Sequence, residues 1–175
     1  MKLRQFALIA GLLAAAVVSG SPPYIPASGP QQTVPAGEVL DLNGLPDVEF
    51  GDTEHELARR GLLGTDVGGC GRTLTGHRTT SPVFIDDRLV LLWLGDSTRT
   101  TGGVGVGSPV QQVRMRYPEL TALHAPQGTY RLDGLLARDG ELAYLFLHDG
   151  RTVRKVIAGY ADWAQRLFAE GDGPC

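Results

Sequence analysis

Two uniformly apolar runs stand out in the hydrophobic pattern of the chain. Leu89–Leu94 and Leu142–Leu147 are apolar at every position, a pattern typical of strands that are covered on both faces. A turn signal follows each run, Asp96-Ser97 in the first case and Asp149-Gly150 in the second. The pattern therefore predicts a sheet with these two runs in its interior.

Three short helices are predicted around this sheet. The first is capped by Asp52 or Thr53, and the second begins at the capping box Ser108–Gln111 and ends at Pro118. The third covers Ala161–Ala169, where the apolar side chains recur at helical spacing. Helices of about ten residues are too short to be stable alone in water. We therefore expect them to pack on the sheet.

The middle of the chain nearly repeats itself. Residues 48–61 align with residues 104–117, and residues 86–96 align with residues 139–149. Each half then contains a short strand, a helix and a strand–turn–strand. We expect an α+β fold of two tandem repeats, each a short helix packed on an antiparallel sheet, followed by a short C-terminal helix. The alternative is a chance similarity between the two halves.

The N-terminus has the pattern of a secretory signal peptide. Lys2 and Arg4 precede the apolar run Phe6–Val18, which is short for a membrane span, and small residues place the cleavage site before Ser21. The site looks like a bacterial lipobox, but Ser21 stands where a lipidated Cys would be. We expect a secreted or cell-envelope protein without a stable membrane span after cleavage; the alternative is that the segment remains as an anchor.

A proline-rich stretch follows the signal segment. Residues 21–46 hold six prolines among Ser, Gly and Gln, so they predict an extended tether, part of which, Glu38–Leu40, can lie along the fold as a strand. The predicted organisation is a signal peptide at 1–20, the tether at 21–46, the first repeat at 47–103, the second repeat at 104–160, and the C-terminal helix and tail at 161–175.

Charge narrows the choice of partners. The chain has a formal net charge of −3, and loss of Lys2 and Arg4 with the signal peptide leaves 14 cations against 19 acids. A nucleic-acid partner is therefore not expected, and no polybasic surface remains for anionic membranes. Charge does not exclude a protein partner, and the oligomeric state stays open.

The sequence predicts no catalytic residues, no metal site and no cofactor. His55-Glu56 begins like a zinc-binding helix, but Arg59 stands where the second histidine would be. The glycine-rich segment Gly103–Pro109 lacks the lysine of a phosphate-binding loop. The consecutive carboxylates Asp86 and Asp87 point different ways on a strand. The alternative is a hydrolytic site assembled in space from distant residues.

Three aromatic residues are the candidate partner-binding surface. Trp93 and Phe146 occupy matching positions in the two apolar runs, and Tyr144 lies two residues from Phe146. We therefore expect all three on one sheet face, where aromatic side chains supply much of the binding energy of protein interfaces. In the alternative, this face is a second core, covered by Trp163 and Phe168 of the C-terminal helix or by the proline-rich arm.

Two stretches carry a resemblance to known proteins. Residues 45–57, followed by Gly69-Cys70, resemble the helix-entry motif of the β-lactamase inhibitory protein family and of small outer-membrane assembly lipoproteins that share its fold. Residues 105–118 look like secreted proteins and lipoproteins of actinobacteria. The resemblance implies a tandem α+β repeat with a shared, often concave, sheet surface, and it implies no catalysis.

The chain also departs from this family. Asp52 replaces the usual Met, Ser108 takes the matching place in the second half, and the family's cysteine pairs within repeats are absent. Inhibition of a β-lactamase therefore does not carry over. We expect a secreted non-enzymatic protein-binding or inhibitor-like module; the alternatives are the exported hydrolase and a structural envelope protein.

Cys70 and Cys175 are expected to form one disulfide, because both lie in the exported part of the chain. The alternative is two free thiols. A bridge closing a loop of about 100 residues would stabilise the fold by about 4–5 kcal/mol on the chain-entropy model. Mass spectrometry of the unreduced protein should find neither thiol alkylated, and alkylation of both without reductant would contradict the bridge.

Overall fold

Strands account for more of the described residues than helices do. The computed structural model describes residues 37–66, 71–77 and 79–171, so the predicted signal peptide, Cys70 and Cys175 lie outside the described residues. The helices are α1 (Glu54–Arg59), α2 (Val110–Arg116) and α3 (Ala161–Glu170). The strands are β1 (Val39–Leu40), β2 (Gly44–Leu45), β3 (Val48–Glu49), β4 (Leu63–Asp66), β5 (Arg72–Leu74), β6 (Thr80–Ile85), β7 (Arg88–Leu94), β8 (Arg99–Thr100), β9 (Thr121–Leu123), β10 (Asp133–Asp139), β11 (Leu142–His148) and β12 (Val153–Tyr160).

Six of these strands form one antiparallel sheet in the order β6-β7-β12-β11-β10-β9. The two apolar runs of the sequence are β7 and β11, and both lie inside this sheet, as predicted. They are not neighbours, because β12 lies between them and pairs with each. The α+β class is therefore confirmed, with more strand than helix.

β7 carries a bulge in its pairing with β6. Val83 pairs with Leu91 and Phe84 pairs with Leu89, which leaves Val90 as the extra residue. Opposite the bulge, Gly159 has a φ of 139° and pairs with Leu91. A Cβ at Gly159 would overlap the carbonyl oxygen of Val90, so only glycine allows β12 to approach β7 here.

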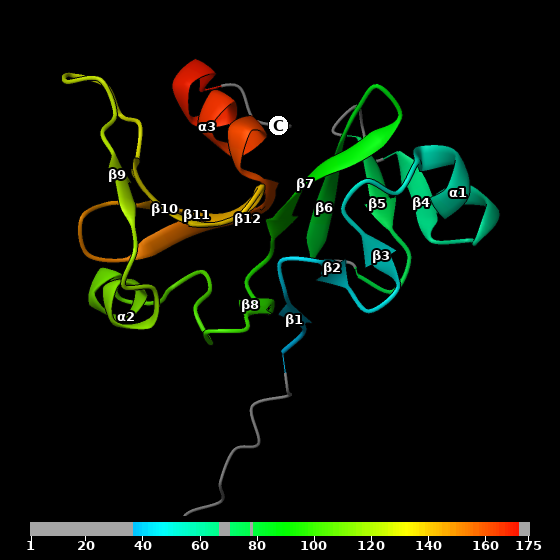
Figure 1. Cartoon of the computed structure of the whole chain (residues 1–175), viewed down its shortest axis with the longest axis horizontal. Helices are drawn as coiled ribbons and strands as arrows, with labels where there is room; N and C mark the ends of the chain where they lie inside the picture. Colours follow the sequence, from blue (N-terminus) through cyan, green and yellow to red (C-terminus); the bar gives the residue numbers. More distant parts are fainter. Residues whose placement is uncertain (1–36, 67–70, 78, 172–175) are drawn as a thin grey trace, which may run out of the picture. The chain divides into compact units, whose positions relative to one another are not determined.

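Both faces of the sheet are covered. One face, here called the α2 face, packs Leu92, Val156 and Phe146 against Val113 of α2 and Leu57 of α1. The other, here called the α3 face, packs residues such as Leu91, Leu145 and Ile157 against Ala161 and Ala164 of α3. Figure 1 shows α2 and α3 on opposite sides of strands β10–β12. This is why β7 and β11 lack the alternation of a half-exposed strand.

The helix ends agree with the sequence analysis at α1 and α3 and differ at α2. Thr53 caps α1 in a full capping box with Glu56, and α3 ends at Gly171 in the left-handed conformation. The predicted box at Ser108 is wrong, because the Ser108 hydroxyl accepts from the Gly105 amide and Pro109 takes the N-cap position.

Backbone hydrogen bonds connect the start of α1 and the start of α2 each to a strand. The Gly51 amide donates to the Leu89 carbonyl, and the Leu89 amide donates back to the Asp52 carbonyl. The Gly107 amide donates to the Val153 carbonyl, and the Val153 amide donates back to the Ser108 carbonyl. α1 is thus attached to the first residues of β7, and α2 to the first residue of β12.

The last part of the predicted tether belongs to the fold. β1 pairs in parallel with β8, as the proposed strand at Glu38–Leu40 predicted, and Leu40 is fully buried. The His77 ring holds this segment in place, since Nδ1 contacts the Glu38 carboxylate and Nε2 lies 2.7 Å from the Asp47 carboxylate. Thr80 and Thr98 donate to the same Glu38 carboxylate.

The position between two carboxylates decides the charge of His77. Burial by itself would lower the pKa of His77, but hydrogen bonds and charge from Glu38 and Asp47 outweigh it and hold the pKa above the ordinary histidine value. The folded protein therefore binds this proton more tightly than the unfolded chain does. The stabilisation is complete below the ordinary pKa of about 6.5 and is lost as the pH rises through the folded pKa.

We expect His77→Gln to destabilise the protein in a pH-dependent way. About one pH unit below the ordinary histidine pKa, the free energy of unfolding should fall by about 1.5–3 kcal/mol, the range for hydrogen bonds to charged groups. This loss should shrink as the pH rises and His77 of the wild type loses its proton. Urea unfolding at a series of pH values measures this difference. His55→Gln, at an exposed position of α1, is the control, and a loss independent of pH would contradict the charged pairing.

Candidate binding pocket

The three aromatic residues predicted to share a face lie on two faces. Tyr144 and Phe146 are buried on the α2 face, with 2% and 0% of their surface exposed. Trp93 is half-buried on the α3 face. Trp93 pairs with Ile157, and Ile157 pairs with Leu145. Because directly paired residues share a sheet face, the Trp93 side chain lies on the same face as Leu145 and on the face opposite to Tyr144 and Phe146. The expectation of one shared aromatic surface is therefore wrong.

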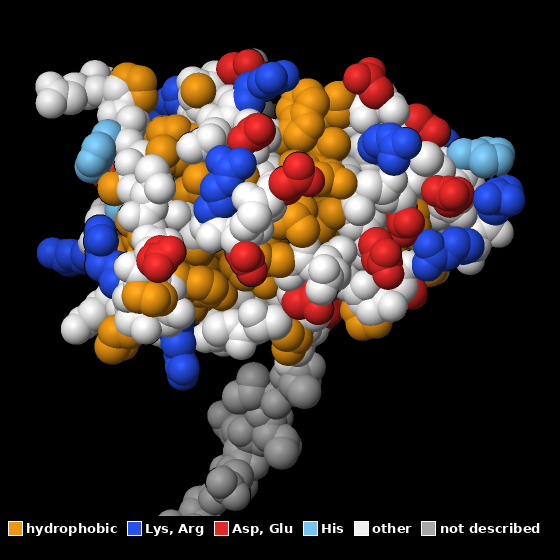
Figure 2. All heavy atoms as spheres, viewed as in Figure 1, with side chains coloured by type: hydrophobic (Ala, Val, Ile, Leu, Met, Phe, Trp, Pro, Cys, Tyr) orange, Lys and Arg blue, Asp and Glu red, His pale blue; other side chains and the backbone are white. Residues whose placement is uncertain are grey.

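The surroundings of Trp93 match the second core that was the alternative in the sequence analysis. Trp93, Trp163 and Phe168 belong to the cluster on the α3 face. Lys155 places its Nζ 4.9 Å from the centroid of the Trp93 ring. Figure 2 shows hydrophobic side chains gathered between α3 and strands β6 and β7.

Tyr144 and Phe146 meet a third aromatic residue, Tyr117, which follows α2. The Tyr117 ring centroid lies 5.7 Å from that of Tyr144 and 5.2 Å from that of Phe146. The Tyr144 hydroxyl donates to the Leu40 carbonyl at 2.9 Å, and the Tyr117 hydroxyl donates to the Thr100 hydroxyl at 2.7 Å. These bonds join the sheet and α2 to β1 and β8.

Burial raises the pKa of Tyr144 to about 12. The phenol is therefore protonated throughout the physiological range and acts as a hydrogen-bond donor. Its role at this position is to hold the Leu40 carbonyl and to present its ring, and no acid–base role follows from its geometry.

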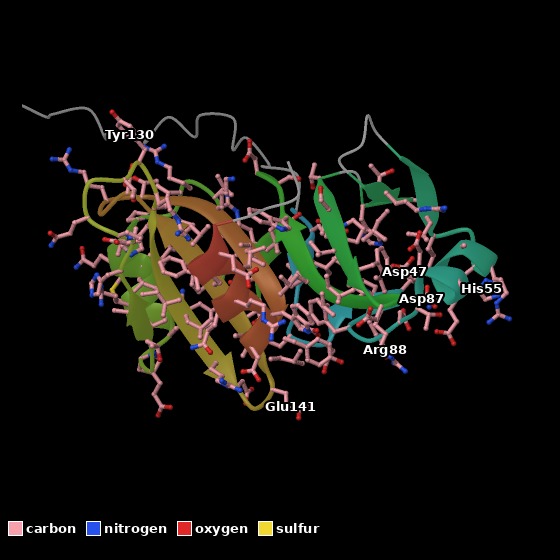
Figure 3. The ribbon with its side chains drawn as sticks, turned by 90° about the horizontal axis from the view of Figure 1, so that it is seen from above. Asp47, His55, Asp87, Arg88, Tyr130 and Glu141 are labelled. Atoms are coloured by element: carbon pink, nitrogen blue, oxygen red, sulfur yellow. The ribbon has the colours of Figure 1, made fainter. Side chains whose placement is uncertain are left out.

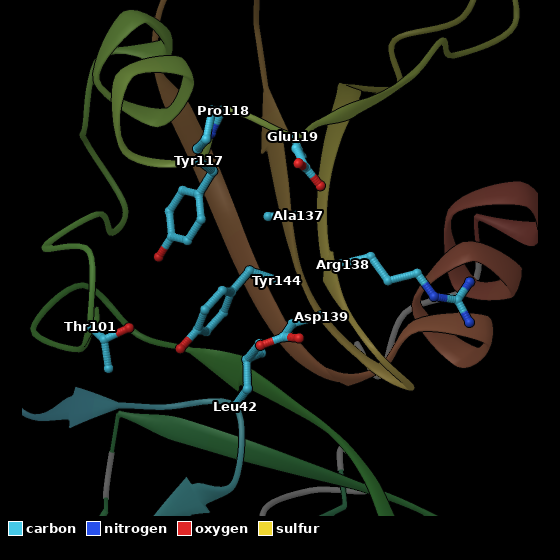
Figure 4. A pocket seen from close by; sticks show the side chains of 9 residues that line it. All are labelled: Leu42, Thr101, Tyr117, Pro118, Glu119, Ala137, Arg138, Asp139 and Tyr144. Carbon is cyan, nitrogen blue, oxygen red and sulfur yellow. The ribbon is translucent and has the colours of Figure 1, made fainter.

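A hollow of about 530 Å³ opens beside the two tyrosines; it is called the tyrosine pocket below. It lies between the loop after β1, the end of α2, and strands β10 and β11 (Figure 4). Ala137 is opposite Tyr144 in the register of β10 and β11, and its small side chain leaves the space open. The lining residues are Leu42, Thr101, Tyr117, Pro118, Glu119, Ala137, Arg138, Asp139 and Tyr144.

Charged side chains at the edge of the tyrosine pocket differ in where they point. Glu119 and Asp139 are exposed and line it, and Figure 4 shows their carboxylates on either side of Ala137. The Arg138 guanidinium turns away toward α3, where its Nη2 lies 3.2 Å from the Asp162 carboxylate. The pocket thus combines aromatic and aliphatic walls with an acidic edge.

A second, smaller hollow of about 200 Å³ lies on the α3 face. Apolar side chains dominate its lining, among them Val83, Ile85 and Trp163. Arg166 and Glu170 are its charged lining residues. It is the part of the second core that α3 leaves incompletely covered, and it lacks the convergent polar groups of the tyrosine pocket.

Sequence reasoning found Tyr144 but missed its partners in the pocket. Tyr117, Glu119 and Asp139 come from the end of α2 and the end of β10, and they are neighbours only because the sheet brings these ends together. The sequence around Tyr117-Pro118-Glu119 predicts only the end of a helix. An aromatic residue at a helix end, followed by a carboxylate, was the only local signal available.

Comparisons with protein-family models, with curated proteins and with solved structures give no match to this chain. Among the described residues, no helix has the length and apolar character needed to cross a membrane. Within residues 37–66, 71–77 and 79–171, no group of three or more His, Cys, Asp or Glu side chains is placed to hold a metal ion.

We expect Tyr144→Phe to lower the free energy of unfolding by about 1–3 kcal/mol, because the buried Leu40 carbonyl loses its donor. Tyr117→Phe should cost less, since the Thr100 hydroxyl also accepts from the Val104 amide and Tyr117 is half-buried. Urea unfolding measures both changes. Tyr130→Phe, at a fully exposed residue (Figure 3), should change nothing, and an equal effect of all three substitutions would contradict this account.

Proposed function

We propose that this chain is a secreted or cell-envelope binding module that holds a protein partner through the tyrosine pocket. The observation that carries the proposal is the convergence of two tyrosine rings, Leu42 and two exposed carboxylates around one open hollow. Concave sites with apolar walls and a few placed polar groups are the usual form of binding sites. The signal peptide pattern supports the compartment.

A partner can bind in the tyrosine pocket without a loss of hydrogen bonds within the protein. Tyr117 is half-buried, and its hydroxyl is already bonded to Thr100. A partner group that fills the pocket therefore covers ring surface without breaking a hydrogen bond of the protein. Tyrosine anchors of this kind, in a preformed pocket with a polar rim, provide much of the energy of protein interfaces.

We also propose that the module consists of two copies of one unit, α1-β4-β5-β6-β7 and α2-β9-β10-β11-β12. The matching backbone bonds at the two helix starts support this, with Leu89 equivalent to Val153. Gly95 and Gly159 then become equivalent, and at each a Cβ would overlap a backbone carbonyl oxygen, that of Thr79 just before β6 and that of Val90 in β7. The correspondence makes β7 equivalent to β12, whereas the sequence alignment had matched β7 to β11.

The equivalence of β7 and β12 implies a local two-fold relation between the two units. Under it, Trp93 corresponds to Ile157, and these two residues pair with each other across β7 and β12. Leu92 and Ala158 pair, as do Leu94 and Val156, which are the same positions exchanged between the units. This is the relation expected for two units joined by their last strands about a local two-fold axis.

An exported hydrolase is the competing function, and the cluster around His77 is where it would be sought. There, the Thr80 and Thr98 hydroxyls bond to Glu38, and both His77 ring nitrogens contact carboxylates. A nucleophilic hydroxyl would instead need a bond to a free imidazole nitrogen. The arrangement favours a structural clamp on β1 over a catalytic dyad.

Site-specific photo-cross-linking tests the binding function. The full chain, carrying p-benzoylphenylalanine in place of the exposed pocket residue Thr101, is irradiated in its exported fraction. We expect one discrete adduct whose protein is identified by mass spectrometry, and none from the same group in place of Tyr130, which is exposed outside the pocket. The captured protein is then purified, and its binding to the wild type is measured by calorimetry.

A pocket-filling substitution completes this test. Thr101→Trp should weaken binding of the purified partner at least tenfold, while the matched Tyr130→Trp leaves it unchanged. Both positions are exposed, but Thr101 also hydrogen-bonds Tyr144. Urea unfolding of both variants therefore accompanies the binding measurement, and Thr101→Trp should unfold close to the wild type. Equal cross-linking from both positions, or a purified partner that binds the Thr101→Trp variant normally, would overturn the proposal.

A further inference from the structure

We propose that the group received by the tyrosine pocket is an arginine side chain of the partner protein. The inference rests on the proposed binding function and names the chemistry of the ligand. It depends on three features of the pocket: the charge of its edge, the direction of its own cation, and the aromatic rings of its wall.

The charge of the pocket edge is negative. Glu119 and Asp139 are exposed and come from two different elements, the end of α2 and the end of β10. Within the described residues, neither carboxylate has an ion-pair partner. Asp41 adds a third negative charge to this region, but its carboxylate already accepts from the Asn43 and Gly44 amides. A cationic ligand group therefore meets charges that the fold has left unpaired.

The one cation among the described lining residues is already engaged. Arg138 places its Nη2 3.2 Å from the Asp162 carboxylate and donates from Nε to the Gly140 carbonyl at 2.9 Å. Figure 4 shows its guanidinium directed away from Ala137 and toward α3. Arg138 therefore does not supply the counter-charge for Glu119 and Asp139, and a ligand can.

The wall of the pocket favours a guanidinium over a compact ammonium. The Tyr117 and Tyr144 rings lie 5.7 Å apart at 58° to each other, and Tyr117 is the more exposed. A planar guanidinium stacks on the partly exposed Tyr117 ring and donates in a fork to carboxylates on different sides. Leu42 and Ala137 provide apolar surface for the aliphatic stem of the same side chain.

NMR titration with a minimal probe tests this inference. The ¹⁵N-labelled full chain is titrated with N-acetyl-arginine amide, and separately with N-acetyl-citrulline amide, which has nearly the same shape but no charge. We expect the arginine probe to shift the amides of Thr101, Glu119 and Asp139 and to bind at least tenfold more tightly than the citrulline probe. High salt should weaken the arginine probe, because the carboxylates are exposed.

Charge-removing variants supply the matched controls. Glu119→Gln and Asp139→Asn should each weaken binding of the arginine probe at least threefold. Glu141→Gln, at an exposed acid of the β10–β11 turn that does not line the pocket, should have no effect. Equal binding of the arginine and citrulline probes, or normal binding of the arginine probe to both pocket variants, would overturn the inference.

Failure of the arginine assignment can be distinguished from failure of the proposed binding function. If Thr101→Trp abolishes binding of the purified partner but the arginine probe shifts none of the pocket amides, the pocket is a binding site for a different group, and the arginine assignment is wrong. If the probe binds as expected and Thr101→Trp leaves partner binding unchanged, the pocket chemistry is correct and the proposed partner surface is wrong.

Discussion

The pairing of β7 with β12 is the constraint on which the rest of the structure depends. Without it, the β6–β7 hairpin and the strands β9–β12 would form two separate sheets, and a two-stranded hairpin is only marginally stable by itself. The pairing needs Gly159, because the carbonyl of the bulged residue Val90 occupies the space of a Cβ. Once the strands are joined, one continuous surface exists for α1 and α2 on one side and for α3 on the other.

The two cores that result have different consequences for binding. On the α3 face, a single ten-residue helix covers the strands and leaves a small apolar hollow at its margin. On the α2 face, the segment from Glu38 to Leu45 contributes Leu40 and Leu45 to the same core as α2 and is held by the bonds of Tyr144 and His77. The tyrosine pocket is the space that remains at the meeting point of that segment, the end of α2 and the small residue Ala137.

Polar groups at this junction divide into two kinds. Tyr144, Tyr117, His77 and Glu38 have their hydrogen bonds satisfied within the fold, so they fix the geometry of β1 and β8. Glu119 and Asp139 are exposed at the edge of the pocket. A rigid set of satisfied groups next to a set of available charges is an arrangement that lowers the entropic cost of binding.

The sequence by itself determined the elements that depend on local chemistry. The apolar runs predicted β7 and β11, Thr53 with Glu56 predicted the start of α1, and the apolar spacing predicted α3. Tertiary structure alone decided which aromatic side chains share a face. One extra residue at Val90 shifts the alternation of β7, and β12 separates Trp93 from β11. Neither the bulge nor the order of strands has a local signal, because both arise from non-local pairing. The tyrosine pocket has no local signal either, because the residues that line it come from segments far apart in the sequence.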